Sequence, residues 1–331
     1  MLTRLRGALD PFILALFGVV VLASLLPARG GLAVAADGLA NAAIVLLFFL
    51  HGAKLSRAAI AVGAGNWRLH LAVLATTFVV FPLFGLGLAA IPGLPPAMAA
   101  GLLFLTLLPS TVQSSIAFTS IAGGNVAAAV CSASFSNLIG VALTPLLVAL
   151  LMGGSGLGGG ISVAAVEKIV GQILLPFVIG HLLRPWVGDF VARHRRLTVL
   201  VDRGSILLVV YTAFGAAVVD GLWHQWPLAS LALVFALCGV LLALVLALTW
   251  VWGRRFQRGD AVVLLFCGSK KSLASGVPIA RVLFPAAQVG GLILPLMLFH
   301  QLQLIACAVI ARALARQAAA AGAGTRGADE R

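Results

Sequence analysis

Ten apolar runs, each long enough to cross a lipid bilayer, follow one another along this chain of 331 residues. Spanning a hydrocarbon core of about 30 Å takes roughly 20 apolar residues per helix. The composition agrees, because 62% of the residues are hydrophobic and only 9% are charged. We therefore predict an all-α polytopic membrane protein with ten transmembrane helices. The predicted spans are 11–28, 33–51, 68–90, 97–121, 126–151, 169–186, 199–220, 228–252, 261–283 and 287–311.

The basic residues indicate how these spans are oriented. The chain has 22 lysines and arginines against nine aspartates and glutamates, which gives a net charge of +13. Most basic residues cluster at the ends of alternate apolar runs, as topology determinants do, and no basic face is interleaved with aromatic side chains. This pattern argues against a nucleic-acid partner. It predicts cytoplasmic N- and C-termini and a location in the plasma (inner) membrane, with the lipid bilayer as surroundings.

A glycine-rich stretch divides the ten predicted helices into two sets of five. Because five is an odd number, the second set enters the membrane upside down relative to the first, as in inverted-repeat transporters. We predict a first five-helix repeat over 1–152, a connector over 153–160 and a second, inverted repeat over 161–313. The remaining residues, 314–331, are predicted to form a disordered cytoplasmic tail.

Polar residues interrupt the fourth and ninth spans at mid-membrane. The interruptions contain Pro109, Ser110, Thr111, Gln113, Ser114 and Ser115 in one span and Ser269, Lys270, Lys271 and Ser272 in the other. Broken helices at matching positions of two halves point to a binding site, because half-helix N-termini attract anions and free carbonyls hold cations. The alternative is that serine, glycine and proline only allow close packing of helices.

The two adjacent lysines favour the binding site. Each charge near the bilayer centre costs about 2.5–3.5 kcal/mol on insertion scales. Snorkelling to the membrane surface would require each side chain to reach across roughly 15 Å, which is longer than a lysine comfortably covers. We therefore expect Lys270 or Lys271 to have a role in binding.

The fifth and tenth spans carry polar clusters that follow the same repeat. These clusters are Ser132, Ser136 and Asn137 in one span and His300, Gln301 and Gln303 in the other. Each cluster alone could be a hydrogen-bonded contact between helices. Because both lie in register beside a broken helix, we predict that they line a cavity.

Catalytic and cofactor-binding patterns are absent from the sequence. None of the nine acidic residues lies in mid-membrane, and there is no H-E-x-x-H or G-x-S-x-G motif. The four cysteines lie in apolar runs without C-x-x-C spacing, which argues against a disulfide framework or a zinc site. We expect neither an enzyme nor a resident cofactor.

Four segments resemble the bile acid:sodium symporter superfamily, in particular its sodium-bile-acid-cotransporter-like branch. They are FFLHGAKLS at 48–56, LPSTVQSSIAFTSIAGGNVAAAVCSASFSNLIG at 108–140, CGSKKSLASGVPIARVLFP at 267–285 and PLMLFHQLQLIACAV at 295–309. The resemblance covers essentially the whole chain. It implies a panel of spans 1, 2, 6 and 7, a core of spans 3, 4, 5, 8, 9 and 10, and a crossing of the broken spans 4 and 9. It also implies organic anions as substrates.

The resemblance bears on the coupling ion as well. In sodium-coupled members, two sodium sites use a Ser-Asn pair in span 4, hydroxyls in span 5, a glutamate and glutamine in span 9 and a glutamine in span 3. By position, the pair falls on Ser114 and Ser115, which would be the sodium ligands here, and the span 3 glutamine falls on Thr77. The glutamate falls on or near Ser269, next to the two lysines.

Sodium beside two lysines, without a carboxylate, is electrostatically disfavoured. A lysine ammonium can take the place of a bound cation, or it can release its proton and couple transport to H⁺. The sequence therefore predicts a secondary active transporter of small organic anions whose coupling ion is Na⁺ by family resemblance, and H⁺ or none by these residues. The alternative is a membrane regulator on the same fold that performs no coupled uptake and acts on another transporter or on ion homeostasis.

Overall fold

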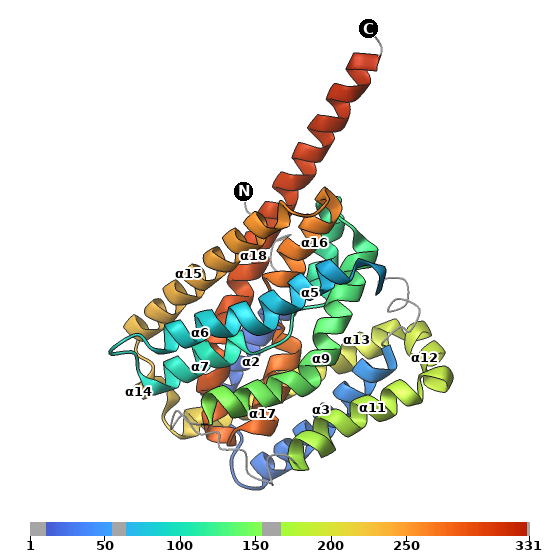
Figure 1. The fold of residues 1–331 in the computed structure, drawn as a ribbon. Coiled ribbons are helices and arrows are strands. Elements are labelled where there is room, and N and C mark those ends of the chain that lie inside the picture. Colours follow the sequence, from blue (N-terminus) through green and yellow to red (C-terminus); the bar gives the residue numbers. More distant parts are fainter. Residues whose placement is uncertain (1–10, 55–63, 154–166, 330–331) are drawn as a thin grey trace.

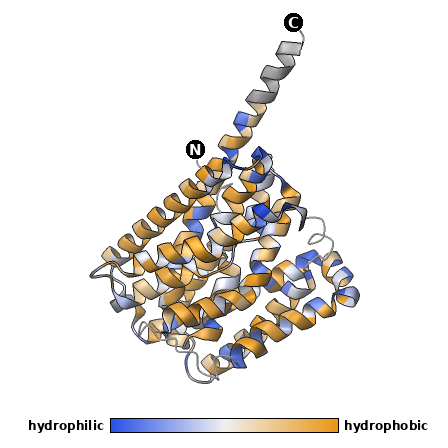
Figure 2. Ribbon diagram, viewed as in Figure 1, coloured by the Kyte–Doolittle hydropathy of each residue, from blue (hydrophilic) through white to orange (hydrophobic). Residues whose placement is uncertain are grey.

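The computed structural model describes residues 11–54, 64–153 and 167–329, and every regular element within them is a helix (Figure 1). Seven helices are long and apolar enough to cross a membrane, or eight if a pair bent by 92° counts as one span. The helices are hydrophobic along most of their length (Figure 2). The chain is therefore a multi-pass membrane protein, as predicted. The count of ten spans in two inverted repeats stays a prediction.

The helices follow the order of the predicted apolar runs. The first part of the chain forms α2 (Pro11–Leu25), α3 (Gly31–Lys54), η1 (Ala64–Asn66), α5 (Trp67–Ala75), the π-helix η2 (Thr76–Val80), α6 (Phe81–Ala89), α7 (Pro96–Thr106), α8 (Gln113–Ile121) and α9 (Val126–Met152). The second part forms the π-helix η3 (Val170–Leu174), α11 (Leu175–Leu182), α12 (Arg184–Arg193), α13 (Arg195–Val219), α14 (Leu222–Gln225), α15 (Leu228–Gly253), α16 (Arg258–Gly268), α17 (Leu273–Leu283) and α18 (Ala286–Asp329).

Both predicted interruptions are breaks in a helix. Helix α7 ends at Thr106 and α8 begins at Gln113, and Pro109 between them has no N–H with which to continue the helix. Helix α16 ends at Gly268 and α17 begins at Leu273, after a Ser272 hydroxyl that accepts a hydrogen bond from the Ser275 N–H at 3.1 Å. This bond is an N-cap, which fixes where the second half-helix starts.

The helices form two groups. We call α2, α3, α11, α12 and α13 the panel group, and the helices α5 to α9 and α15 to α18 the crossing group. Figure 1 shows α3, α11 and α12 together at one edge of the molecule, away from α5, α15 and α16. Helix α13 joins the two groups, because it packs on α2 and α3 on one side and on α17 and α18 on the other.

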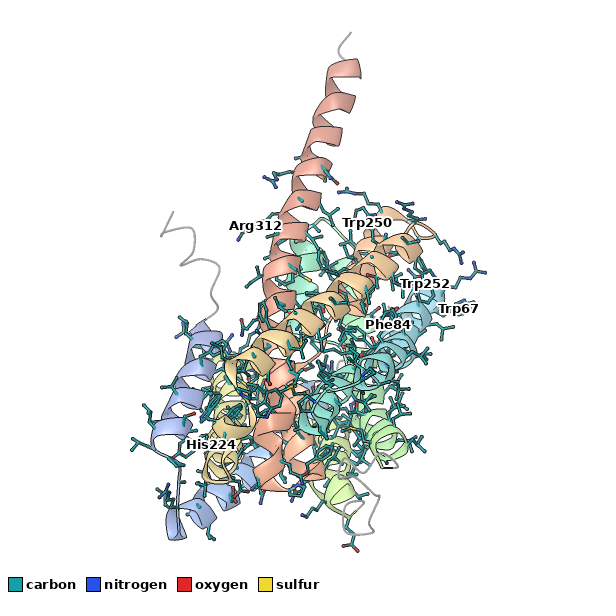
Figure 3. The ribbon with its side chains drawn as sticks, turned by 90° about the vertical axis from the view of Figure 1, so that its left-hand side faces the viewer. Trp67, Phe84, His224, Trp250, Trp252 and Arg312 are labelled. Carbon is teal, nitrogen blue, oxygen red and sulfur yellow. The ribbon has the colours of Figure 1, made fainter. Side chains whose placement is uncertain are left out.

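Tryptophan side chains lie near one end of the helices. Trp67 and Trp250 are 61% and 47% exposed and lie with Trp252 and Arg312 toward the same end, whereas His224 lies toward the opposite end (Figure 3). Tryptophan is enriched where membrane helices meet water. This end of the helices therefore has the features of a membrane boundary.

The C-terminal helix differs from the disordered tail predicted over 314–331. Helix α18 continues to Asp329, which is consistent with the high helix propensity of its alanine-rich sequence. The predicted connector over 153–160 lies outside the described residues except for Gly153, whose N–H donates to the Ala149 carbonyl at the end of α9.

Two glycines set the closest approach within the panel group. A Cβ added at Gly52 of α3 would overlap the carbonyl oxygen of Phe177, and one added at Gly180 of α11 would overlap the carbonyl oxygen of Phe49. The two backbones are therefore in direct contact at this point. Small residues serve this purpose in membrane helices, where van der Waals packing stabilises association.

We expect Gly52→Val to destabilise the panel group, because overpacking of a close contact costs about 1–3 kcal/mol. The melting temperature of the purified protein should fall by several degrees. Gly38→Val is the matched control, since Gly38 lies on the same helix and has no atom within 4 Å of an added Cβ. Equal melting temperatures for the two variants would contradict the account of this contact.

Candidate functional site

The two helix breaks lie against each other. The Ser272 N–H donates to the Pro109 carbonyl at 2.8 Å, and the Ser110 hydroxyl donates to the Cys267 carbonyl at 2.6 Å. The Ser115 hydroxyl donates to the Phe266 carbonyl at 3.0 Å. Backbone groups released by one break thus find partners on the other, as a low-dielectric environment requires.

The side chain of Lys271 is buried beside this contact. Its Nζ donates three hydrogen bonds to backbone carbonyls, at 2.8 Å to Thr77, 2.7 Å to Thr106 and 2.7 Å to Leu108. An ammonium has three N–H donors, so all are used. Two of these carbonyls lie at the C-terminal end of α7, where the helix dipole favours a cation.

The π-helix explains why the Thr77 carbonyl is available. The N–H of Phe81 would bond to Thr77 in a regular α-helix, but it donates to the Thr76 carbonyl instead. The next residue is Pro82, which has no N–H. The Thr77 carbonyl is therefore left without its helical partner and accepts the bond from Lys271.

Gln303 of α18 holds the backbone of Lys271 in place. Its Oε1 accepts from the Lys271 N–H at 2.9 Å, and its Nε2 donates to the Lys271 carbonyl at 3.0 Å. The same Nε2 lies 2.8 Å from Nδ1 of His300. Part of the predicted polar cluster in the tenth span thus positions this lysine.

Lys270 is equally buried but has a different environment. Its Nζ has no hydrogen-bond partner in the described part of the chain, and it lies 4.2 Å from the ring centre of Phe118 and 5.4 Å from that of Phe266. Aromatic faces attract a cation, so these rings offer the ammonium a cation–π contact. The two adjacent lysines therefore lie in separate pockets.

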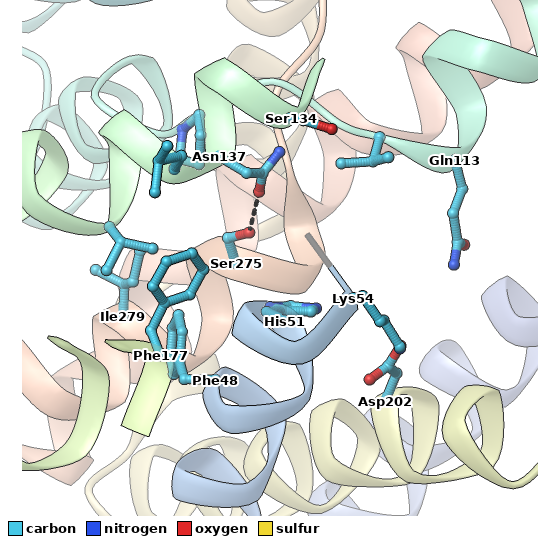
Figure 4. Close-up of a pocket in the computed structure, with 14 residues that line it drawn as sticks. Phe48, His51, Lys54, Gln113, Ser134, Asn137, Phe177, Asp202, Ser275 and Ile279 are labelled. Carbon is cyan, nitrogen blue, oxygen red and sulfur yellow. Dashed lines mark hydrogen bonds and ion pairs between the residues drawn. The ribbon is translucent and has the colours of Figure 1, made fainter. Parts of the chain in front are cut away.

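A cavity of about 190 Å³ lies between the panel group and the crossing group (Figure 4). Its panel side includes His51 and Lys54 of α3 and Asp202 of α13, and Lys54 forms an ion pair with Asp202. The crossing group contributes Asn137 and Ser275, whose Oγ donates to Asn137 Oδ1 at 3.0 Å. The apolar part of the cavity wall consists of side chains that include Phe48, Phe177 and Ile279.

The cavity touches the first helix break directly. Pro109, Val112 and Gln113 line it, and Asn137 Nδ2 donates to the Ser110 carbonyl at 2.8 Å. Of the predicted site residues, Pro109, Gln113 and Asn137 line this cavity, whereas Lys270 and Lys271 do not. The structure thus separates a cavity with polar walls from two buried lysines.

The other predicted residues take part in local networks. Thr111 Oγ1 lies 2.8 Å from Ser114 Oγ and 3.0 Å from Ser115 Oγ, so the two hydroxyls expected to bind sodium already have protein partners. Ser132 Oγ is 2.7 Å from His70 Nδ1, and Ser136 Oγ accepts from the Ser110 N–H at 2.9 Å.

Two further predicted residues, Ser269 and Gln301, differ in whether their polar side-chain atoms have hydrogen-bond partners. The hydroxyl of Ser269, the residue after α16, donates to the Leu265 carbonyl of that helix. In contrast, Nε2 of Gln301 is buried and has no hydrogen-bond partner among the residues that the structure describes. Neither side chain lines the cavity.

Sequence reasoning missed several cavity residues, above all His51, Lys54, Asp202 and Ser275. A signal was present for His51, Lys54 and Ser275, because they lie in the segments 48–56 and 267–285 that resemble the symporter superfamily. Asp202 lies among arginines at a predicted span end and carried no comparable signal. Within the described ranges, no group of three or more His, Cys, Asp or Glu residues could hold a metal ion.

Comparison with known proteins places the chain in a family. Residues 10–316 match the SBF-like CPA transporter family. The chain is 54% identical over 318 residues to a protein of Escherichia coli (strain K12) named "Putative symporter YfeH", with 95% of each chain covered. It is 56% identical over 321 residues to the uncharacterized protein PA2026 of Pseudomonas aeruginosa, with 96% of each covered.

More distant relatives carry a functional name. Sodium/bile acid cotransporter 7 of Rattus norvegicus is 27% identical over 277 residues, covering 81% of this chain and 80% of that protein. The family is one of transporters rather than enzymes. The resemblance noted in the sequence is confirmed: the chain belongs to the SBF-like CPA transporter family, within the bile acid:sodium symporter superfamily.

Proposed function

We propose that this protein is a secondary active transporter of small organic anions that bind in the cavity between the panel group and the crossing group. The observation that carries the proposal is the position of this cavity. It lies where the two helix groups meet, and it reaches the break between α7 and α8. Movement of one group against the other would expose such a cavity to alternate sides of the membrane.

The cavity walls suit a small anion. Lys54 supplies a positive charge, Gln113 carries amide donors, and Phe48 and Phe177 offer apolar surface. The volume of about 190 Å³ is below the roughly 300–1,000 Å³ of drug-sized sites. We infer that the substrate is compact, with one anionic group that competes with Asp202 for Lys54.

The direct test is uptake into liposomes that contain the purified protein, with a panel of labelled small carboxylates and sulfates. We expect at least one of them to accumulate above protein-free liposomes. With that substrate, Lys54→Gln should reduce uptake about tenfold or more, because the charge that attracts the anion is lost. Asp202→Asn should lower KM, since it removes the competing carboxylate.

Failure of every anion in the panel would contradict the transport proposal and favour a regulatory role. Full activity of Lys54→Gln, or an equal loss of activity in both variants, would contradict the assignment of the anion to Lys54.

An ion pair closes the opposite end of the contact between the groups. Arg281 of α17 lies 2.7 Å from Asp37 of α3, so it joins the crossing group to the panel group. Lys54 is at the other end of the same α3 helix. With Lys54 on the cytoplasmic side, as the basic residues predict, the ion pair would hold the cavity closed toward the outside.

We expect Arg281→Gln to favour opening toward the outside. The reporter is Ile279→Cys, a buried cavity position, in a chain whose own four cysteines are buried. Labelling by a membrane-impermeant maleimide should become several-fold faster in the Arg281→Gln background. Arg316→Gln, the same charge change at an exposed position of α18, is the control. Equal labelling rates in the two backgrounds would contradict the gate.

The proposed orientation has its own test. A reporter fused after Arg331, or inserted within 254–258, should lie in the cytoplasm, and one inserted within 153–160 should lie outside, because basic flanks are retained on the cytoplasmic side. Reporter enzymes active on only one side of the inner membrane provide the measurement. An outside location of the fusion after Arg331 would contradict the predicted cytoplasmic C-terminus.

A further inference from the structure

We propose that the ammonium group of Lys271 occupies a built-in monovalent-cation site, which accepts a free cation when this side chain is removed. The inference deepens the proposed function, because it concerns the coupling ion. Its evidence is the set of three backbone carbonyls around Nζ, at 2.7 to 2.8 Å.

Two of the three carbonyls lack their usual helical partner for identifiable reasons. The Thr77 carbonyl is released by the π-helix and by Pro82, as described above. The Thr106 carbonyl would accept from the Ser110 N–H in a continuous helix, but that N–H donates to the Ser136 hydroxyl at 2.9 Å. The fold itself therefore leaves these two carbonyl oxygens free to accept a hydrogen bond from the lysine.

The remaining surroundings exclude water and favour positive charge. The ring centre of Phe81 lies 4.1 Å from Nζ, and Lys271 is 0% exposed. No carboxylate pairs with Lys271 in the parts of the chain that the structure describes. Carbonyl oxygens and the C-terminal end of α7 therefore balance the charge, which is how proteins bind K⁺ in a ring of backbone carbonyls.

The site joins three segments that are distant in the sequence. Thr77 belongs to η2, Thr106 ends α7, and Lys271 lies in the break between α16 and α17. A free ion at this point would hold the segments together only while it was bound. A tethered ammonium cannot dissociate, so the contact between the breaks does not depend on an external cation.

The adjacent Lys270 provides a matched control. It is also 0% exposed, but its Nζ has aromatic neighbours and no carbonyl acceptor in the described structure. Removal of either side chain deletes the same atoms from neighbouring buried positions. Only removal of Lys271 should leave a set of acceptors for a cation.

The test measures melting temperatures of wild type, Lys271→Ala and Lys270→Ala in choline chloride. Choline is then replaced at constant ionic strength by sodium, potassium, methylammonium or propylammonium chloride. Propylammonium supplies the atoms that Lys271→Ala lacks, whereas choline has no N–H donor. We expect Lys271→Ala to melt several degrees lower than wild type in choline. A small cation should raise its melting temperature saturably, by about 3 °C or more.

Wild type and Lys270→Ala should show no saturable response to these cations. An equal response of the two alanine variants would contradict the proposal, as would a Lys271→Ala variant that responds to none of the salts. Failure to recover folded Lys271→Ala in any small-cation salt would also count against it. Because the readout is stability, its result is independent of whether an organic anion is transported.

Discussion

The structure depends on how two broken helices satisfy their backbone groups inside a membrane. Breaking a helix in a hydrocarbon layer exposes polar groups that water cannot reach, so each must find a protein partner. Lys271 meets this need at three carbonyls simultaneously, and Gln303 fixes the backbone of Lys271 in turn. The cost of burying a charge is thereby offset by hydrogen bonds and by the C-terminal end of α7.

The contact between the two helix breaks and the cavity beside it are separate parts of the structure. The contact between the breaks is buried, and it gives the crossing group a firmly connected centre. The cavity lies on the face toward the panel group, where Lys54 and Asp202 form the ion pair at which we propose that the anion binds. The proposed anion site and the proposed cation site thus adjoin the same break, between α7 and α8.

The helix breaks could be predicted from sequence because proline, serine and lysine are conspicuous inside apolar runs. The direction in which each lysine side chain points could not be predicted. It depends on the π-helix at Thr77 and on the residue at which α7 ends, and contacts between distant segments set both. The cavity was predicted only on its Gln113 and Asn137 side. Lys54 looked like a topology signal, and Asp202 like a residue at a span end, until the fold placed them together.

We propose that the tethered ammonium of Lys271 takes the place of the coupling cation. The most direct measurement is the initial rate of anion uptake into liposomes as external sodium is exchanged for choline, at constant pH and membrane potential. We expect a rate that is independent of sodium, because the three backbone carbonyls already hold the ammonium of Lys271. A strong, saturable stimulation of uptake by sodium would contradict it.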